Sequence, residues 1–361
     1  MSVSTSFGVR WVLGLGLLFA LSDCGDPETF QTVRGTQLIS VRAEPPSAPP
    51  GSSVQLELSY FDRESFEASA ADPEVEVLWL ADCENPERDS PLACLPNWGR
   101  LARGALALRD GQGNTGRVSA EELAESTAFG EQFRLQVSDD AVANRVRVPG
   151  SIGYGISHVL YALCRGHLEL LPADARPVPL DCRDEDGKRV PQRNFTLGYT
   201  SVSIFDGLPG KNPTVDGIEF DGQLVTRAAC KTEADCPRSP SGWMYRCFEG
   251  DCLPEVRRCG GECEPHRVQP RVASDAAELD PASVPVGAAP MRELLWVEYL
   301  GIGAFDRIES LISDREGRRR NSYAAEWTAP RKEFLRPVPI WTVVKDNRGG
   351  TTQSRIEVLL R

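Results

Sequence analysis

Eleven cysteines limit what this 361-residue chain can fold into more than any other feature of its sequence. Ten of them suffice for five disulfides, and six of those ten are crowded into residues 230–263. A segment so poor in apolar residues cannot build a core and needs covalent cross-links to hold its shape. Disulfides persist in oxidising compartments, so the cysteine content predicts an exported protein. The predicted disulfide cysteines are Cys83, Cys94, Cys164, Cys182, Cys230, Cys236, Cys247, Cys252, Cys259 and Cys263.

Two pairs of these cysteines are close enough in sequence for local bridges. Cys83 and Cys94 enclose ten residues, and Cys164 and Cys182 enclose seventeen. Each bridge would fasten a loop and stabilise the fold by about 3 kcal/mol, by chain-entropy reasoning. A redox-active pair would show a Cys-x-x-Cys motif, and neither pair does. We therefore expect both bridges to be structural.

The crowded cysteines of residues 230–263 allow two interpretations. Three disulfides would staple the segment, with a connectivity that the sequence leaves open. A zinc site on Cys259, Cys263, His266 and a fourth thiolate is the alternative. Zinc sites usually contain a Cys-x-x-Cys pair, and this segment has none. We therefore predict three disulfides and no metal.

The N-terminus carries an export signal. A positive charge precedes an apolar stretch, residues 11–21, which is too short to span the ~30 Å hydrocarbon core of a bilayer but has the length of a signal peptide. Residues 21–24 read Leu-Ser-Asp-Cys and resemble the lipobox of bacterial lipoproteins, which are cleaved before a lipid-modified cysteine. We therefore expect residues 1–23 to be a signal peptide, Cys24 to be lipidated, and residues 24–36 to form a flexible tether.

One residue departs from the lipobox pattern. Asp23 stands where that pattern has Gly, Ala or Ser, and Ala20-Leu21-Ser22 offers an ordinary signal peptidase an alternative site. Ordinary cleavage would leave eleven cysteines and hence an odd thiol, whereas lipid on Cys24 leaves an even ten. Cysteine parity thus favours the lipid-anchored form.

The rest of the chain has the composition and the sequence pattern of a β protein. Glycines number 32 and prolines 27, and the apolar runs are short and bounded by turn residues. Strands are expected at residues 38–41, 54–60 and 75–80, the second with period-2 alternation and the third with Trp79 inside it. This series resembles the opening strands of immunoglobulin-like domains, in which a tryptophan packs across the sandwich.

A related pattern returns near the C-terminus. Residues 294–299 echo the Trp79 strand. Residues 338–344 and 355–360 read as a closing hairpin that resembles the end of immunoglobulin-like and PKD-like repeats. We therefore predict an all-β, mainly β fold of two immunoglobulin-like β-sandwich domains, with a boundary near Gly210.

Each predicted domain is longer than the ~100 residues of a plain sandwich, so each must contain an insertion. Domain 1, residues 37–209, is expected to carry an elaborated loop at about 95–150, in which a short helix starts at Ser119. Domain 2, residues 210–361, is expected to carry the cysteine-rich insertion at about 228–266.

Several short motifs are distributed along the mature sequence: Cys24-Gly25-Asp26, Arg42-Ala43-Glu44-Pro45-Pro46, Tyr154-Gly155-Ile156, Cys164-Arg165-Gly166, Gly198-Tyr199-Thr200, Asn212-Pro213 and the ending from Trp341 to Gly350. In these motifs the chain resembles uncharacterised myxobacterial-type bacterial lipoproteins with immunoglobulin-like or PKD-like domains. The resemblance covers nearly the full mature length. It supports the expected compartment and fold, and it implies no activity.

Charge and motifs limit the possible functions. A net charge of −12 would repel the phosphates of nucleic acid. Only three histidines occur, and the sequence contains no motif of a zinc protease, serine hydrolase, P-loop protein or dinucleotide-binding protein. We therefore expect no enzyme activity, no cofactor and no nucleic-acid partner.

The resulting prediction is an exported, lipid-anchored cell-envelope protein on the periplasmic or outer-surface side, with a non-enzymatic binding role. Its expected partners are the membrane, through the lipid, and an envelope protein. A structural spacer or subunit of an envelope complex is the first alternative. A hydrolase whose site is assembled from distant residues is the second.

Overall fold

The computed structural model describes residues 35–69, 74–112, 118–143, 145, 153–172, 176–207, 210–226, 228–238, 244–260, 263–280 and 291–361. The predicted signal peptide, Cys24 and residues 25–34 of the predicted tether lie outside these described residues. Within the described ranges, no helix is long and apolar enough to cross a membrane.

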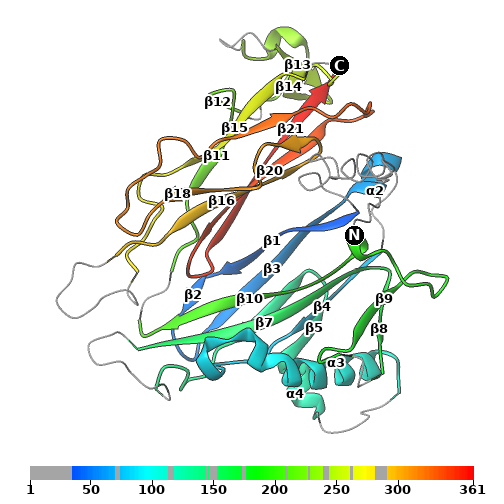
Figure 1. Cartoon of the computed structure of the whole chain (residues 1–361), viewed down its shortest axis with the longest axis vertical. Coiled ribbons are helices and arrows are strands. Elements are labelled where there is room, and N and C mark those ends of the chain that lie inside the picture. The colour runs from blue at the N-terminus through cyan, green and yellow to red at the C-terminus, as the bar shows by residue number, and fades with distance from the viewer. Residues whose placement is uncertain are drawn as a thin grey trace, which may run out of the picture.

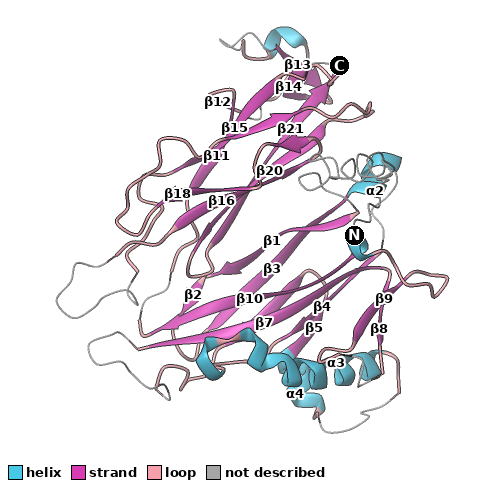
Figure 2. Cartoon of the chain, viewed as in Figure 1, coloured by secondary structure: helices cyan, strands magenta, loops and turns pink. Residues whose placement is uncertain are grey.

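The predicted fold class, mainly β with two immunoglobulin-like sandwiches, is confirmed. Four of the sheets pack in two pairs. In Figure 1 the second sandwich, coloured green to red, lies above the first, coloured blue to green. Helices are few, and the longest lies below the first sandwich (Figure 2).

Two sheets, in the orders β1-β3-β6 and β2-β10-β7-β4-β5, form the first sandwich. Val54, Leu56 and Leu58 of β3 face its core, and the residues between them face outward, as the period-2 alternation predicts. The strands are β1 (Thr36–Glu44), β2 (Ser47–Ala48), β3 (Ser53–Asp62), β4 (Val75–Leu80), β5 (Thr127–Phe129), β6 (Gln132–Gln136), β7 (Tyr154–Arg165) and β10 (Phe195–Phe205).

Trp79 lies in the centre of this core. Its ring stacks on Phe133 of the facing sheet, with 6.1 Å between ring centroids, and meets Tyr161 edge-on at 5.9 Å. The indole N–H donates to the carbonyl of Gly130 at 2.8 Å, which satisfies the one polar atom of the side chain. The predicted tryptophan across the sandwich is therefore present.

Residues 95–150 differ from the predicted elaborated loop. They contain α3 (Leu95–Arg109), α4 (Ala120–Ser126) and the sheet strands β5 and β6. α3 buries Trp98 and Leu101 against the outer face of the five-stranded sheet, so the first unit has a third layer. The predicted short helix is α4, in which Ser119 Oγ accepts a hydrogen bond from the N–H of Glu122.

Pro96 and Gly99 explain why the sequence does not predict α3. Pro96 reads as a helix breaker, yet it lies in the first turn, where its missing N–H has no intrahelical partner to lose. Gly99 reads as a loop residue, but it lets the helix approach the carbonyl oxygen of Pro177. A Cβ at this position would lie 2.1 Å from that oxygen.

The second sandwich consists of the sheets β12-β11-β15-β19-β17 and β13-β14-β21-β20-β16-β18. Its strands are β11 (Val215–Phe220), β12 (Gln223–Leu224), β13 (Met244–Phe248), β14 (Asp251–Val256), β15 (Pro265–Val272), β16 (Leu295–Gly301), β17 (Ala304–Phe305), β18 (Glu309–Ser313), β19 (Ala325–Thr328), β20 (Val338–Asp346) and β21 (Thr351–Leu360). The last two form the predicted closing hairpin.

The remaining elements connect these sheets. A two-stranded sheet of β8 (His167–Leu170) and β9 (Leu180–Arg183) lies beside the first sandwich. The short helices are α2 (Arg63–Ala68), η1 (Glu87–Asp89), η2 (Pro91–Cys94), η3 (Gln192–Asn194) and η4 (Glu233–Asp235).

Trp296 is not the structural counterpart of Trp79, although the two strands read alike. Leu295 and Val297 point into the second core, so Trp296, one position out of phase, lies half-buried on the outer side of β16. The fully buried tryptophan of this sandwich is Trp327, whose indole N–H donates to the carbonyl of Ile302 at 3.0 Å.

The cysteine-rich segment is joined to a sheet rather than forming a separate loop insertion. Its hairpin strand β14 pairs in parallel with the end of β21, through Glu255 and Val256. The hairpin thereby extends the six-stranded sheet at its edge. The sequence could not reveal this pairing because the partner strand lies about a hundred residues further along.

Polar contacts hold the two sandwiches together. Asn212 donates through Nδ2 to the carbonyl of Ala43 at 2.8 Å and accepts through Oδ1 from the N–H of Thr351 at 2.7 Å. Ser40 Oγ, on β1, donates to Gln353 Oε1, on β21, at 2.8 Å. These contacts, made by three separate segments, fix the position of one sandwich on the other.

Candidate functional site

The structure pairs ten cysteines in five disulfides. Cys24 lies outside the described residues. Five disulfides in one chain are typical of extracellular and envelope proteins. The bonds are Cys83–Cys94, Cys164–Cys182, Cys230–Cys247, Cys236–Cys252 and Cys259–Cys263.

The residues of the zinc alternative have other partners. Cys259 and Cys263 are bonded to each other, and Nδ1 of His266 lies 2.8 Å from a carboxylate oxygen of Asp221. The sulfur atoms of Cys230, Cys236 and Cys252 lie within 4.8 Å of one another, because their two disulfides are neighbours. A zinc ligand has to be a free thiolate, so these bonded sulfurs cannot hold the ion.

Ser201 and His158 bear on the hydrolase alternative, since a serine nucleophile needs a neighbouring base. Ser201 Oγ lies 2.7 Å from Nδ1 of His158, and Nε2 lies 3.1 Å from the carbonyl oxygen of Asp89. A carbonyl can only accept, so Nε2 carries the proton and Nδ1 accepts from Ser201. Burial lowers the pKa of His158, and only 2% of the residue is exposed. The pair therefore joins β7 to β10, with the histidine buried and Ser201 half-buried.

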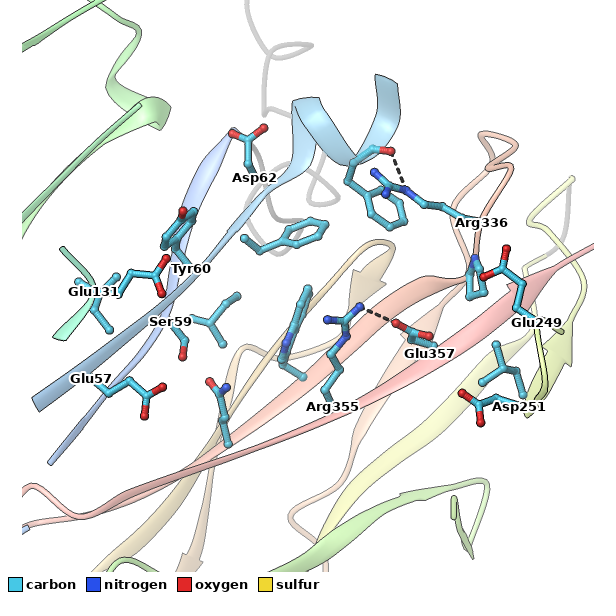
Figure 3. A pocket seen from close by; sticks show the side chains of 18 of the residues that line it. Glu57, Ser59, Tyr60, Asp62, Glu131, Glu249, Asp251, Arg336, Arg355 and Glu357 are labelled. Atoms are coloured by element: carbon cyan, nitrogen blue, oxygen red, sulfur yellow. Dashed lines mark hydrogen bonds and ion pairs between the residues drawn. The ribbon is translucent and has the colours of Figure 1, made fainter. Parts of the chain in front are cut away.

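A groove of about 680 Å³ lies between the outer faces of β3 and β21, one strand from each sandwich (Figure 3). The tip of the β13–β14 hairpin closes one side of it. Since the walls come from opposite ends of the chain, the groove exists only because the two sandwiches pack together. The outward side chains of the two strands are Glu57, Ser59 and Phe61 from β3 and Gln353, Arg355 and Glu357 from β21.

Aromatic side chains form the floor of the groove. The Phe61 ring lies 4.9 Å from Trp341 and 5.3 Å from Phe66, measured between ring centroids. Ile39 of β1 packs in the same cluster, which joins the outer faces of both sandwiches. The floor is therefore apolar and packed.

Two arginines lie in the groove, and both are engaged by neighbouring groups. Arg355 is centred 5.4 Å from the Trp341 ring and pairs with Glu357 at 2.5 Å, as Figure 3 shows. Arg336 is centred 3.9 Å from the Phe66 ring and donates to the carbonyl of Phe66 at 2.9 Å, near the end of α2. The aromatic rings of the groove thus already hold two guanidinium groups.

Four carboxylates in the groove have no hydrogen bond or ion pair with any described residue. Three of them are exposed, and Asp251 is half-buried. Together with Asp62 and Glu357, they give the lining six acidic groups against two basic ones. The resulting field attracts cations. The four unpaired carboxylates are Glu57, Glu131, Glu249 and Asp251.

Asp62 also lines the groove, but it belongs to the structure of α2. Burial disfavours its ionised form, yet hydrogen bonds from Thr36 and Ser65 and the charge of Arg165 outweigh burial and lower its pKa. The Asp62 carboxylate accepts the N–H of Ser65 at 2.7 Å and so caps the helix. The Asp62 carboxylate is therefore already engaged in hydrogen bonds within the protein.

Two disulfides hold the hairpin tip that contributes to the groove. Cys230–Cys247 and Cys236–Cys252 tie β13 and β14 to the preceding loop. The turn between these strands presents Phe248, Glu249 and Asp251 to the groove. The cysteines identified in the sequence thus position a part of the site, although none of them lines it.

The groove residues themselves were missed by sequence reasoning. The available signal was the polar, outward side of β3, where Glu57 and Ser59 alternate with core residues. Alternation shows that a face is outward, but not what covers it. The facing wall, near residue 355, belongs to the last strand of the chain, so no local pattern around β3 predicts it.

The described fold defines the chain as a two-domain immunoglobulin-like β-sandwich protein. No protein-family model and no curated protein matches it. Similar solved structures include the two tandem V-type regions of a v-region-containing chitin binding protein, at 10% identity and a TM-score of 0.24, covering 91% of this chain and 100% of that one. Chimeric titin Z1Z2 functionalized with a peptide from decorin matches at 9% identity and a TM-score of 0.18, covering 91% and 98%. Trypsin-activated alpha-2-macroglobulin from Escherichia coli matches at 11% and 0.19, covering 91% and 17%. These scores are too low to bear on function.

Proposed function

We propose that this protein is an exported, lipid-anchored cell-envelope protein that binds a partner, without catalysis, in the groove between its two sandwiches. The observation that carries the proposal is the set of four unpaired carboxylates around an aromatic floor. A junction that only joined two domains would have no use for four like charges facing one cavity, where they repel one another. A ligand of opposite charge would relieve that repulsion.

The proposed compartment rests on the signal segment, the lipobox resemblance at Cys24 and the five disulfides. Residues 24–34 would span at most about 40 Å when fully extended. Lipid on Cys24 would therefore keep the groove close to the membrane surface, within reach of other envelope proteins. The resemblance to myxobacterial-type lipoproteins supports the same compartment.

A structural spacer is the second candidate function, and one observation favours it. In the described part of the cysteine-rich segment, Met244, at 49%, is the one exposed large apolar side chain. That part therefore offers no broad apolar patch of the kind that marks many protein interfaces. A spacer would need the rigid junction at Asn212, but it would not need the charges of the groove.

Site-specific photo-crosslinking in the native envelope separates the two candidates. A photo-reactive amino acid is placed at position 57 or 249, inside the groove, and at position 125 or 185 as controls. Glu125 and Glu185 are exposed carboxylates outside the groove. We expect one discrete adduct from the groove positions and none from the controls. Equal adducts from all four positions, or none from the groove, would contradict the binding proposal.

A further inference from the structure

We infer that the groove binds an extended, basic polypeptide segment of a partner protein, whose arginine or lysine side chains pair with the four unpaired carboxylates. This inference rests on the proposed binding function and adds the chemistry of the ligand. It follows from the distribution of charge, from the aromatic rings and from the shape of the groove.

The charge of the groove selects a cationic ligand. Glu57 and Glu131 lie on the first sandwich, and Glu249 and Asp251 lie opposite them on the disulfide-held hairpin (Figure 3). The two arginines of the lining offset only two of its six negative charges. An anionic ligand would face repulsion from both walls, whereas a cationic one would be attracted by both.

The positions of the carboxylates favour several cations on one chain over a single metal ion. Among the described residues, the one group of side chains close enough to share a metal ion consists of bonded cysteines. Glu57 and Asp251, in contrast, come from different sandwiches. A polypeptide with basic side chains at intervals can reach such separated charges, while a single metal ion cannot.

The rings of the groove show how a guanidinium group is held there. Arg355 combines the face of Trp341 with the carboxylate of Glu357. Phe248, half-buried, lines the same wall as Glu249 and Asp251, so it provides a second ring beside unpaired carboxylates. An arginine of the ligand would meet the same combination there, an aromatic ring and a carboxylate.

The shape of the groove favours a polypeptide over a compact small molecule. Small-molecule pockets are mostly apolar and bury most of their ligand. This groove runs between two strands and carries charges on both walls. An extended segment can lie along such a groove and expose its far side to solvent.

The inference is tested by fluorescence anisotropy with a labelled peptide of about ten residues, about 33 Å when extended, that alternates arginine and alanine. The groove variant is Glu57→Gln/Glu131→Gln/Glu249→Gln/Asp251→Asn. The matched control, Glu125→Gln/Glu185→Gln/Asp216→Asn/Asp275→Asn, removes four exposed charges outside the groove. Each exposed ion pair contributes about two- to threefold in affinity, so the groove variant should bind about 30-fold more weakly. The control should bind within about twofold of the unmodified protein.

A single substitution should change the affinity in the opposite direction. Arg355→Gln frees the Trp341 face and the Glu357 carboxylate for the ligand. We expect this variant to bind the arginine peptide about threefold more tightly, because it removes one positive charge from the groove. A variant that binds more weakly would contradict the assigned role of the ring and the carboxylate.

Three outcomes would overturn the inference. The first is equal binding of the peptide by the groove variant and the control. The second is equal binding of a peptide in which glutamate replaces arginine. The third is a concentration-dependent dimer in sedimentation that the groove variant abolishes, which would make a second copy of the chain the occupant. If any of the three is found while crosslinks from positions 57 and 249 persist, the proposed binding function stands and only the ligand class is wrong.

Discussion

Arg348, at the tip of the β20–β21 hairpin, pairs with the buried carboxylate of Glu293. The same guanidinium group lies 5.7 Å from the ring of Phe205 in the first sandwich, and the hydroxyl of Ser203 donates to the Arg348 carbonyl at 3.2 Å. One residue therefore pairs with a buried carboxyl group of the second sandwich and contacts the first.

Replacing Arg348 should destabilise the protein strongly. Arg348→Met leaves the carboxylates of Glu293 and Asp346 buried without their cation, and breaking a buried pair in this way costs about 3 to 5 kcal/mol. Denaturant unfolding measures the loss. Arg318→Met is the control, because the Arg318 side chain is 75% exposed, and it should lower the free energy of unfolding far less than Arg348→Met does. Equal losses for the two variants would contradict the account of the junction.

The same cluster predicts a dependence of stability on pH. Burial, together with the charge of Asp346, raises the pKa of Glu293 from 4.5 to about 7, although Arg348 acts in the opposite direction. The raised pKa means that the folded protein binds more protons than the unfolded chain between these two values. The contribution of Glu293 to the free energy of unfolding is thus fully present below about pH 4.5. It is lost, by about 1 to 3 kcal/mol, as the pH rises to about 7.

The variant Glu293→Gln isolates this effect, because the glutamine does not titrate. The free energy of unfolding, measured between about pH 5 and pH 7.5, should fall less in the variant than in the unmodified protein. His158, whose pKa is lowered by burial, contributes a slope of the opposite sign below about pH 6.5 in both proteins, which cancels in the comparison. Parallel pH profiles would show that Glu293 is ionised throughout.

The disulfides of the hairpin should control the groove and the edge of the second sandwich, but not the first sandwich. Cys236→Ala/Cys252→Ala removes a cross-link worth about 3 kcal/mol, whereas the shorter loop of Cys259→Ala/Cys263→Ala loses about 2 kcal/mol. Hydrogen exchange of residues 244–256 should accelerate in the first variant, while exchange in β7 stays unchanged. The first variant should also lose peptide affinity, because the turn that carries Glu249 is released. Faster exchange across the whole chain, β7 included, would contradict a local role for this disulfide.

The unpredicted helix α3 should contribute to the stability of the first sandwich. Trp98 is 1% exposed against the sheet, so Trp98→Ala should cost about 3 to 5 kcal/mol in thermal or denaturant unfolding. Leu108, on the same helix, is 54% exposed, and Leu108→Ala should change the free energy of unfolding by less than about 0.5 kcal/mol. Similar effects at the two positions would imply that α3 does not cover the sheet as described.

Sequence reasoning predicted those parts of the molecule that depend on local patterns. The alternation around Leu56, the strand of Trp79 and the closing hairpin could be read because each repeats a local period or turn signal. The helix cap at Ser119 was readable for the same reason. Local chemistry was sufficient in each of these cases.

The features of the fold that depend on contacts between distant segments could not be predicted from the sequence. Trp296 matched Trp79 in its neighbours but lies one position out of phase with its own core, which only the sheet register decides. The groove needs β3 and β21 to lie on either side of it, and no local pattern links strands so far apart in sequence. The parallel pairing of β14 with β21 is non-local in the same way.

The account as a whole depends on export and on lipid at Cys24, and mass spectrometry of the mature N-terminus from the native envelope tests both directly. We predict an N-terminal peptide that begins at Cys24 and carries the mass of a diacylglyceryl group on its sulfur. An unmodified peptide that begins at Asp23 would contradict lipid anchoring, and an intact N-terminus at Met1 would contradict export itself.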